Sequence, residues 1–261
     1  MKKTVFQSFL QKNSISPTEY LPIVHSSEAH VISKCLEQGI IKRTRCEVFN
    51  EDLLYFFVGR PSYKKLADKD AEYWELPSCV VFDFTLKGAK RAYPFDTGAF
   101  QRRKYPSFVN MMPMDEYEIE PSPENIKRAI GAFFQDPRSY YRLTPYSEND
   151  FSRKHELDPT EAEIKALYKL IKTTSNSFDD RRFSIEIQFQ NSFYLENQSP
   201  IFCVVPETYL ESEKFMGWAD KYETVVETYP VYPLRADYYY AAIYEKIEGL
   251  YRKNGYYEVQ N

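Results

Sequence analysis

The chain has 261 residues, which suits one large domain or two small ones, and its 43% hydrophobic and 28% charged residues are typical of a globular protein. Its formal net charge of −4 argues against a protein that coats nucleic acid, but it leaves local contact with a nucleic acid open. The four Cys and three His residues show no metal-binding spacing, so we expect reduced thiols and no metal site. The sequence shows neither a signal-peptide pattern nor a membrane-length apolar run, so we expect a cytoplasmic protein with no membrane contact.

The first half of the chain predicts strands with one helix among them. Residues 1–18 are expected to form a polar N-terminal arm. After the arm we expect, in chain order, a strand at 21–25, a helix at 28–38, a strand within 40–45, a strand at 53–58, a charged loop or short helix at 64–75, and a strand at 78–84. Ser26 and Ser27 offer the helix an N-cap and Gly39 a C-terminal stop. Residues 90–100 contain a turn-rich stretch at 93–98, and residues 101–121 are expected to be irregular.

The second half alternates helices and strands. Ser122, Pro123 and Glu124 open a helix in the order of N-cap, proline and acid. We then expect a helix at 160–173, a strand at 183–189, a strand at 201–205, a short helix near 207–219, a strand at 222–229 and a helix at 235–253. Because these elements interleave irregularly and no linker is visible, the sequence predicts a single α+β domain over residues 1–261.

An aromatic strand that ends in a Gly-Arg-Pro turn is the most informative local feature. Residues 53–58 are apolar and aromatic, and Gly59 and Pro61 end the strand abruptly. Arg60 precedes a proline, so it is expected to be extended at the mouth of a buried strand. A cation in this place can meet a phosphate or a carboxylate of a ligand, or it can pair with a carboxylate of the protein itself.

A second polar feature lies on the strand predicted at 183–189. Ser184, Glu186 and Gln188 share one face of this strand, because side chains alternate with a period of two. The opposite face is apolar. The polar stripe points either into a cleft, where Glu186 can take part in chemistry, or into solvent.

The order of these motifs resembles the ADP-ribosyltransferase superfamily, and most closely its bacterial toxins that modify nucleic acid. In these toxins a strand with a histidine opens the fold, an aromatic strand ends in a turn with the catalytic arginine, and a late strand carries the catalytic glutamate. Here His25 and Ser26, the segment 57–62, and the segment 182–186 follow in the same order. The resemblance covers about residues 20–65 and 180–190.

The sequence departs from the pattern of this family at three places. The first motif is His25-Ser26 rather than a longer His-x-Thr. Gly59 stands where the toxins have a proline. Gln188 follows Glu186 at the second position, so the Glu-x-Glu of the arginine-modifying transferases is absent.

The resemblance implies a split mixed β-sheet core with helices packed on the outside, and NAD as the co-substrate. It implies that Glu186 stabilises the cationic transition state at the ribose, and that Arg60 holds the phosphates of NAD or the acceptor. Tyr55 and Tyr63 would stack on the nicotinamide, while His25 would bind the ribose on the adenosine side with Ser26 nearby.

The function that follows is an NAD-dependent ADP-ribosyltransferase, such as a toxin or a phage-defence effector, whose acceptor is nucleic acid (RNA or DNA) or protein. An antitoxin or chaperone protein is an expected partner. Two alternatives stay open at this point: a non-enzymatic module that binds a partner through an aromatic cleft on the same fold, and an enzyme similar to RNA 2′-phosphotransferases. The transferase requires His25, Arg60 and Glu186 to meet at one cleft, because a polar group on each strand is most easily explained by a shared site.

Overall fold

A computed structural model describes residues 3–12, 20–63, 71–173, 181–233 and 235–256. It has α+β architecture with a mixed sheet and several helices, as the sequence predicted. The chain divides into two compact units. Unit 1 comprises Met1–Tyr20, Leu86–Asn176 and Arg181–Gln188, and unit 2 comprises Leu21–Thr85, Ser177–Asp180 and Phe189–Asn261. The expectation of a single domain over 1–261 stays a prediction.

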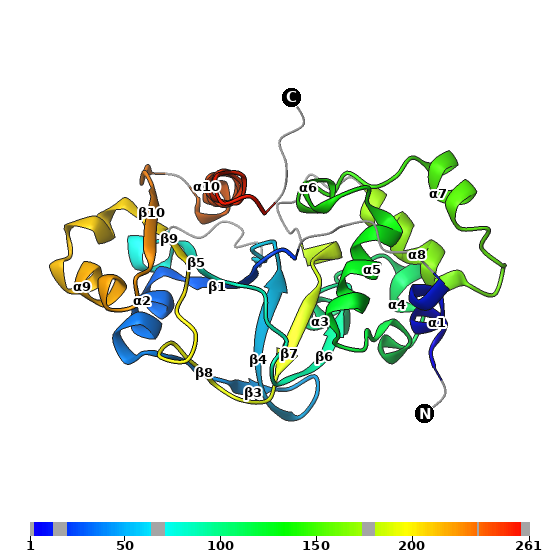
Figure 1. Cartoon of the computed structure of the whole chain (residues 1–261), viewed down its shortest axis with the longest axis horizontal. Coiled ribbons are helices and arrows are strands. Elements are labelled where there is room, and N and C mark those ends of the chain that lie inside the picture. Colours follow the sequence, from blue (N-terminus) through cyan, green and yellow to red (C-terminus); the bar gives the residue numbers. More distant parts are fainter. Residues whose placement is uncertain (1–2, 13–19, 64–70, 174–180, 234, 257–261) are drawn as a thin grey trace. The chain divides into compact units, whose positions relative to one another are not determined.

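Unit 2 is organised around a mixed sheet in which β1 occupies a central place (Figure 1). The strands of this unit follow one another across the sheet as β4 (Glu51–Val58), β1 (Ile23–Glu28), β5 (Pro77–Phe82), β9 (Phe202–Pro206) and β10 (Val225–Tyr229). Outside this order, β3 (Thr44–Cys46) pairs with the first residues of β4. All neighbours are antiparallel except β9 and β10, which are parallel. A separate pair joins β2 (Ile40–Ile41) to β8 (Phe193–Tyr194).

Strand β1 is longer than its apolar sequence predicted. Each residue from Ile23 to Glu28 has a partner in β5, so pairing carries the strand through the polar residues that follow His25. Ser26 and Ser27 are therefore strand residues, and the prediction that they cap the next helix is wrong. Helix α2 (Ala29–Gln38) begins after Glu28, whose side chain makes no capping hydrogen bond.

Helices cover both faces of the unit 2 sheet (Figure 1). Helix α2 packs against β1 and β5, and α10 (Tyr239–Lys253) packs against β5, β9 and β10. Gly39 ends α2 at a φ of 67°, which confirms the predicted stop. Helix α9 (Glu213–Lys221) packs against α2, and it is capped by Ser212, whose side chain accepts a hydrogen bond from Phe215 N.

Unit 1 consists mainly of helices, together with the neighbouring strands β6 and β7. Its elements are α1 (Val5–Lys12), β6 (Ala89–Tyr93), α3 (Thr97–Gln101), α4 (Ser107–Asn110), η2 (Met114–Tyr117), α5 (Pro123–Phe133), α6 (Pro137–Tyr141), α7 (Glu148–Lys154), α8 (Ala162–Lys172), η3 (Arg181–Phe183) and β7 (Glu186–Phe189). Ser122 caps α5 by accepting a hydrogen bond from Asn125 N, as predicted. The short helices α3, α4, α6 and α7 were not predicted, because their apolar positions are too few to show a period.

An aromatic core holds the helices of unit 1 together. The Phe133 ring lies 6.5 Å from that of Phe6, 5.7 Å from that of Phe151 and 5.2 Å from that of Phe183. Phe6, Phe9 and Leu10 of α1 are buried in this unit. The described part of the expected polar arm is therefore a packed helix, because three apolar residues lie on one face among polar ones. Residues 13–18 of that arm lie outside the described residues.

The four cysteines are free thiols, and three of them are buried. Burial raises the pKa of Cys35 to about 11 and that of Cys79 to about 12. It raises the pKa of Cys203 well above its ordinary value. Among the described residues, no helix is both long enough and apolar enough to cross a membrane.

Candidate functional site

The residues predicted to bind NAD are divided between the two units. His25, Ser26, Tyr55, Arg60 and Tyr63 belong to unit 2, whereas Glu186 belongs to unit 1. Each group has a defined environment within its own unit. The expectation that His25, Arg60 and Glu186 meet at one cleft stays a prediction.

Glu186 is the first residue of β7, and its carboxylate is surrounded by hydrogen-bond donors. The hydroxyl of Thr97 donates to Oε1 over 2.8 Å, and the backbone N–H of Thr97 donates to Oε2 over 3.1 Å. The side-chain amide of Gln188, two residues further along the strand, donates to Oε1 over 2.8 Å. Both carboxylate oxygens are thus held in place, while the side chain is only 2% exposed.

Burial changes the acidity of Glu186. Desolvation, with the nearby charge of Asp96 as a second cause, raises the pKa of Glu186 to about 8, although the hydrogen bonds from Gln188 and Thr97 oppose the rise. The carboxyl group therefore exchanges its proton in the range where enzymes work. This is the behaviour expected of a general acid or base.

Charged and polar groups of unit 1 extend this environment into a network. Asp96 caps α3 by accepting a hydrogen bond from Ala99 N, and its Oδ2 lies 3.6 Å from Nη1 of Arg181. Arg91 of β6 donates to the side-chain oxygen of Gln188 over 3.2 Å. We call Arg91, Asp96, Thr97, Arg181, Glu186 and Gln188 the Glu186 network.

The structure decides between the two directions that the sequence left open for the polar stripe of 183–189. Ser184 and Gln188 are fully buried, and Glu186 is nearly so. The alternative in which the stripe faces solvent is therefore wrong. Buried polar side chains need partners, and the network supplies those of Glu186 and Gln188.

The sequence did not predict the part played by Thr97 and Asp96. Both lie in a stretch that was expected to be rich in turns, and Thr97 is 89 residues away from Glu186 along the chain. The available signal was the order Asp96-Thr97-Gly98 after an aromatic residue, since Asp is a frequent N-cap. This signal predicts the helix, but not the carboxylate that the helix contacts.

In unit 2, a tight turn fixes the backbone on either side of Arg60. Gly59 has a φ of 66°, and Arg60 N donates to Val58 O over 2.7 Å across the glycine. Gly59 N also donates to Pro22 O over 2.7 Å. A Cβ at Gly59 would lie 2.6 Å from Cδ1 of Leu21, and a proline cannot adopt this φ. The positive φ and the close approach of Leu21 therefore explain the glycine at this position.

The guanidinium of Arg60 lies against α10. Arg60 is 2% exposed, and its Cζ is 5.3 Å from the centre of the Tyr244 ring. Nη2 of Arg60 donates to the Tyr244 hydroxyl over 3.4 Å, and that hydroxyl donates to Pro61 O over 2.6 Å. Tyr244 thus links the helix to both Arg60 and the turn that carries it.

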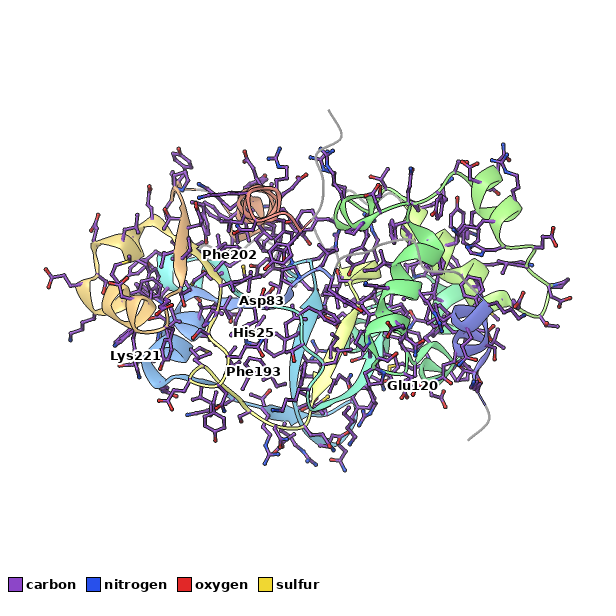
Figure 2. All side chains as sticks on the ribbon, viewed as in Figure 1. His25, Asp83, Glu120, Phe193, Phe202 and Lys221 are labelled. Carbon is purple, nitrogen blue, oxygen red and sulfur yellow. The ribbon has the colours of Figure 1, made fainter. Side chains whose placement is uncertain are left out.

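His25 of β1 is held in one tautomer. Its Nδ1 lies 3.0 Å from the carbonyl oxygen of Tyr55, so Nδ1 must carry a hydrogen and donate. Desolvation lowers the pKa of His25, although the hydrogen bond to Tyr55 opposes this change. The neutral ring therefore keeps a lone pair on Nε2, which can accept a hydrogen bond from a hydroxyl group. The ring also packs against Phe56, with centroids 5.6 Å apart, in a region where Phe193 lies nearby (Figure 2).

A cavity of about 320 Å³ opens beside His25, within unit 2. Its apolar wall includes Val31, Ile40, Ile41, Leu53 and Leu54, and Tyr55 also lines it. Lys42 gives it positive charge, whereas the ammonium of Lys34, which also lines it, is paired with Glu37 outside the lining. No acidic residue contributes to the lining itself. The volume is at the lower end of the range for small-molecule pockets. The cavity suits an apolar or aromatic group that carries a negative charge.

Ser26 and Tyr63 serve the local structure around the Arg60 turn. The Ser26 hydroxyl accepts a hydrogen bond from Ser62 N over 3.1 Å. The Tyr63 hydroxyl donates to Ser78 O over 3.0 Å, and its ring stacks on Tyr240 at 4.7 Å and 6°. One face of the Tyr63 ring is therefore covered by the protein, so nicotinamide stacking there stays a prediction.

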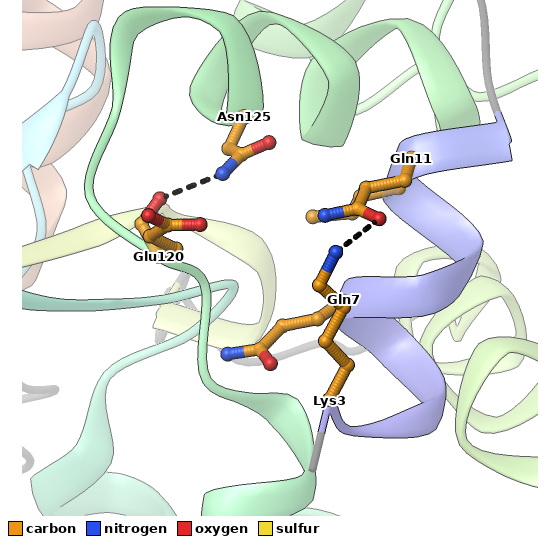
Figure 3. A pocket seen from close by; sticks show the side chains of 6 residues that line it. Lys3, Gln7, Gln11, Glu120 and Asn125 are labelled. Carbon is orange, nitrogen blue, oxygen red and sulfur yellow. Dashed lines mark hydrogen bonds between the residues drawn. The ribbon is translucent and has the colours of Figure 1, made fainter. Parts of the chain in front are cut away.

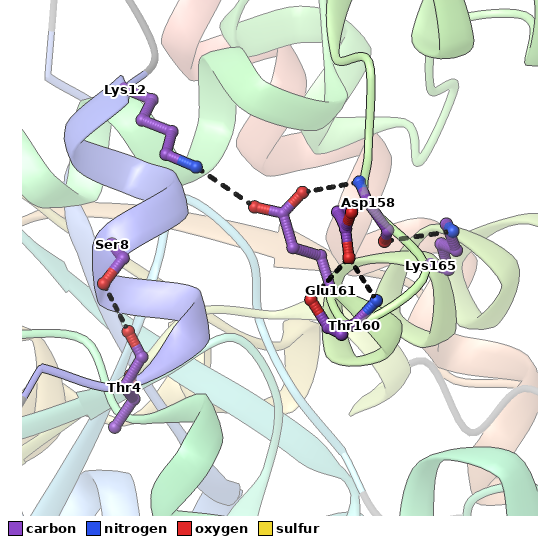
Figure 4. A network of polar contacts seen from close by, with 7 residues as sticks. All are labelled: Thr4, Ser8, Lys12, Asp158, Thr160, Glu161 and Lys165. Atoms are coloured by element: carbon purple, nitrogen blue, oxygen red, sulfur yellow. Dashed lines mark hydrogen bonds and ion pairs between the residues drawn. The ribbon is translucent and has the colours of Figure 1, made fainter.

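Unit 1 also contains a small polar pocket and a hydrogen-bonded carboxylate outside the Glu186 network. A pocket of about 40 Å³ between α1 and the start of α5 has room for little more than a water molecule (Figure 3). Near α8, the Glu161 carboxylate accepts hydrogen bonds from Lys12 and from Asp158 N (Figure 4). Glu161 therefore provides a hydrogen-bonded carboxylate outside the Glu186 network, which is useful as a control.

Comparisons of the chain with models of protein families, with curated proteins and with solved structures find no match. In the part of the chain that the structure describes, no group of three or more His, Cys, Asp or Glu residues is arranged to hold a metal ion. The candidate site therefore rests on the geometry of the two units alone.

Proposed function

We propose that this chain is an NAD-dependent ADP-ribosyltransferase in which Glu186 is the catalytic carboxylate. The observation that carries the proposal is the burial of Glu186 among positioned donors, with a pKa raised to about 8. A carboxylate with both oxygens fixed is prepared to face a developing positive charge. The split mixed sheet of this family and its use of NAD belong to the same proposal.

The chemistry assigns a definite task to this carboxylate. The bond between C1′ of the ribose and the nicotinamide nitrogen breaks, and nicotinamide leaves with the electron pair. The oxocarbenium ion that forms is stabilised by the negative charge of Glu186. The acceptor then forms a bond to C1′ and releases a proton, which the carboxylate can take.

The ionised form of Glu186 is the active one in this scheme. Because its pKa is about 8, only part of the protein carries that form at neutral pH. We therefore expect the rate of nicotinamide release to rise as the pH increases from about 6 to about 9. A rate that is constant over this range would contradict the assignment.

Unit 2 contains groups suited to the rest of NAD. Arg60 provides a permanently charged guanidinium, and Lys42 adds positive charge to the cavity beside His25. The lone pair on Nε2 of His25 can accept a hydrogen bond from a ribose hydroxyl. In the proposal, these residues bind the phosphates and the adenosine side, and Tyr55 and Tyr63 contact the nicotinamide.

The acceptor in this proposal is nucleic acid or protein, and the chain acts as a toxin or phage-defence effector in the cytoplasm. An antitoxin or chaperone would control it. These statements depend on the order of His25, Arg60 and Glu186, which resembles that of the nucleic-acid-modifying toxins. Incubation with labelled NAD together with DNA, RNA and cell protein tests them, because the label shows which fraction is modified.

One observation favours a second function, that of a non-enzymatic binding module. The cavity beside His25 is largely apolar, and none of its lining residues is an acid that could act as the catalyst. Such a cavity can bind a partner or small molecule without chemistry. This function predicts NAD-independent binding and no release of nicotinamide.

Nicotinamide release by Glu186→Gln tests the proposed enzyme. The substitution keeps the shape of the side chain but removes its charge, so we expect a loss of about 100-fold or more. Glu161→Gln is the matched control, since it removes another hydrogen-bonded carboxylate of unit 1 and should leave the rate within about twofold. Circular dichroism confirms that both variants are folded. Equal rates in folded Glu186→Gln and the unmodified chain would remove Glu186 from catalysis.

NAD titration of Arg60→Ala tests the contribution of unit 2. We expect the binding free energy to weaken by about 1–3 kcal/mol, the range for a lost charge-assisted hydrogen bond. Arg252→Ala, at an exposed position of α10, is the control and should bind NAD unchanged. Unaltered affinity in a folded Arg60→Ala protein would make Arg60 a structural residue.

A further inference from the structure

Two short 3₁₀ helices of unit 2 expose a group of large apolar side chains. Helix η1 (Tyr73–Glu75) contributes Tyr73 at 41% and Trp74 at 43% exposure, and η4 (Glu207–Glu211) contributes Leu210 at 50%. Tyr209 joins the two helices, because its ring centroid is 6.0 Å from that of Tyr73. We call these four residues the aromatic patch. Exposed apolar patches of this kind commonly mark interaction sites.

The rings of the aromatic patch are held in a defined arrangement by contacts within the protein. Tyr73 and Trp74 meet edge to face, with centroids 4.9 Å apart and planes at 81°. A capping box holds η1, in which the Glu75 carboxylate accepts a hydrogen bond from Glu72 N. Leu76 O also accepts a hydrogen bond from Ala29 N, which ties η1 to the start of α2. A partner would therefore meet a preformed surface.

The residues around the aromatic patch are strongly acidic. The two 3₁₀ helices and their flanking positions contain Glu72, Glu75, Glu207, Glu211 and Glu213. Glu28, at the end of β1, pairs with Pro77 just after η1. Lys214 is the nearest described basic residue along these segments. The described residues of these two segments therefore carry an excess of negative charge.

Acidic and aromatic character together select one kind of partner. Negative charge repels the phosphates of nucleic acid, so an RNA or DNA strand does not fit this surface. The flat face of an exposed indole attracts a guanidinium, and neighbouring carboxylates can accept its N–H groups. At such a surface the aromatic ring contacts the flat face of an arginine guanidinium, and the neighbouring carboxylates accept hydrogen bonds from its N–H donors.

We propose that the aromatic patch and its surrounding glutamates form a docking surface for a basic, arginine-containing segment of a partner protein. An arginine of that segment stacks on Trp74 or Tyr73, and further basic residues pair with the glutamates. The surface lies within unit 2 and involves none of the residues assigned to NAD. The proposal therefore does not depend on the enzymatic activity.

Fluorescence polarisation with a labelled nona-arginine peptide tests this surface on the full chain. We expect Trp74→Ala to weaken binding about tenfold, the scale of a desolvated cation–π contact. Tyr194→Ala is the matched control, because Tyr194 is 56% exposed on β8 and lies outside the aromatic patch. Replacing the peptide by nona-lysine should also weaken binding, since an ammonium group does not stack as a planar guanidinium does.

A pair of charge variants separates this surface from general attraction to an acidic protein. Glu72→Gln with Glu211→Gln should weaken binding of the peptide, whereas Glu47→Gln with Glu245→Gln removes the same charge elsewhere and should leave it nearly unchanged. Equal binding by all variants would overturn the proposal. Sedimentation provides the remaining outcome: a dimer that Trp74→Ala converts to a monomer would identify a second copy of this chain as the occupant, and would also overturn it.

Discussion

Unit 1 buries the carboxyl group of Glu186 among hydrogen-bond donors, whereas unit 2 buries the guanidinium of Arg60 against an aromatic ring. Glu186 and Arg60 are each only 2% exposed, yet their environments handle the charge in different ways. Glu186 can give up its charge by taking a proton, and its pKa of about 8 reflects that freedom. Arg60 cannot lose its proton in a protein, so its surroundings must accept a permanent cation. A change of pH therefore alters the charge of Glu186 and leaves that of Arg60 fixed.

The largest expected effects are losses of stability caused by substitutions in the core of one unit or the other. Phe133→Ala empties the aromatic core of unit 1, and Phe82→Ala does the same in unit 2, where Phe82 contacts Phe56 and Phe193. Each should lower the free energy of unfolding by about 3–5 kcal/mol. Hydrogen exchange with mass spectrometry then follows individual segments. We expect α5 and η3 to lose protection in Phe133→Ala, and β4 and β5 in Phe82→Ala; the reverse pattern would contradict the division into units.

The next expected effect is a dependence of stability on pH that Glu186 causes and Arg60 does not. In the folded chain Glu186 stays protonated up to about pH 8, but in the unfolded chain only up to about its ordinary 4.5. Since the folded state binds the extra proton between these values, its stability should fall as the pH rises through this window, by about 1.4 kcal/mol per pH unit. Glu186→Gln removes this dependence. Its stability relative to the unmodified chain should therefore increase with pH.

Denaturant unfolding at several pH values measures this difference. Arg60→Met is the control from unit 2, because arginine does not titrate in the window and the substitution should change stability equally at every pH. A constant difference between Glu186→Gln and the unmodified chain would show that the folded-state pKa of Glu186 is not raised.

The smallest effect concerns one hydroxyl group of the Glu186 network. Thr97→Val keeps the backbone donor to Glu186 but removes the side-chain donor, so we expect a loss of about 1 kcal/mol in stability. The pKa of Glu186 should rise further, since this hydrogen bond lowers it. Carboxyl carbon NMR reports that pKa. Thr160→Val, whose hydroxyl bonds an exposed Asp158, should change stability by less than about 0.5 kcal/mol; equal effects at the two positions would deny Thr97 a special role.

The sequence predicted what local patterns determine. The aromatic run that became β4, the cap at Ser122 and the stop at Gly39 each depend on neighbouring residues, and the structure contains them. The full length of β1 could not be predicted, because pairing with β5 supplies the hydrogen bonds that its polar residues need. The hydrogen bonding of the Glu186 carboxylate likewise depends on Thr97, which the fold brings to it from another element.

The same limit applies to the candidate site. His25, Arg60 and Glu186 were chosen for their residue types and their strands, and the structure gives each a distinctive environment. The tautomer of His25 depends on a carbonyl group of β4, and the position of Arg60 on a tyrosine of α10. No local pattern carries that information, since these contacts join elements that are distant in the sequence.

The difference between the buried cysteines and the one that is not buried allows selective labelling of the chain. Cys35, Cys79 and Cys203 stay protonated at neutral pH because burial raises the pKa of each, and a protonated thiol is a poor nucleophile. Cys46, at the end of β3, is the one cysteine that is not buried. A maleimide dye should consequently attach at this position alone in the native protein. The chain thus comes with a natural attachment point for fluorescence, beside the strand that leads to Arg60.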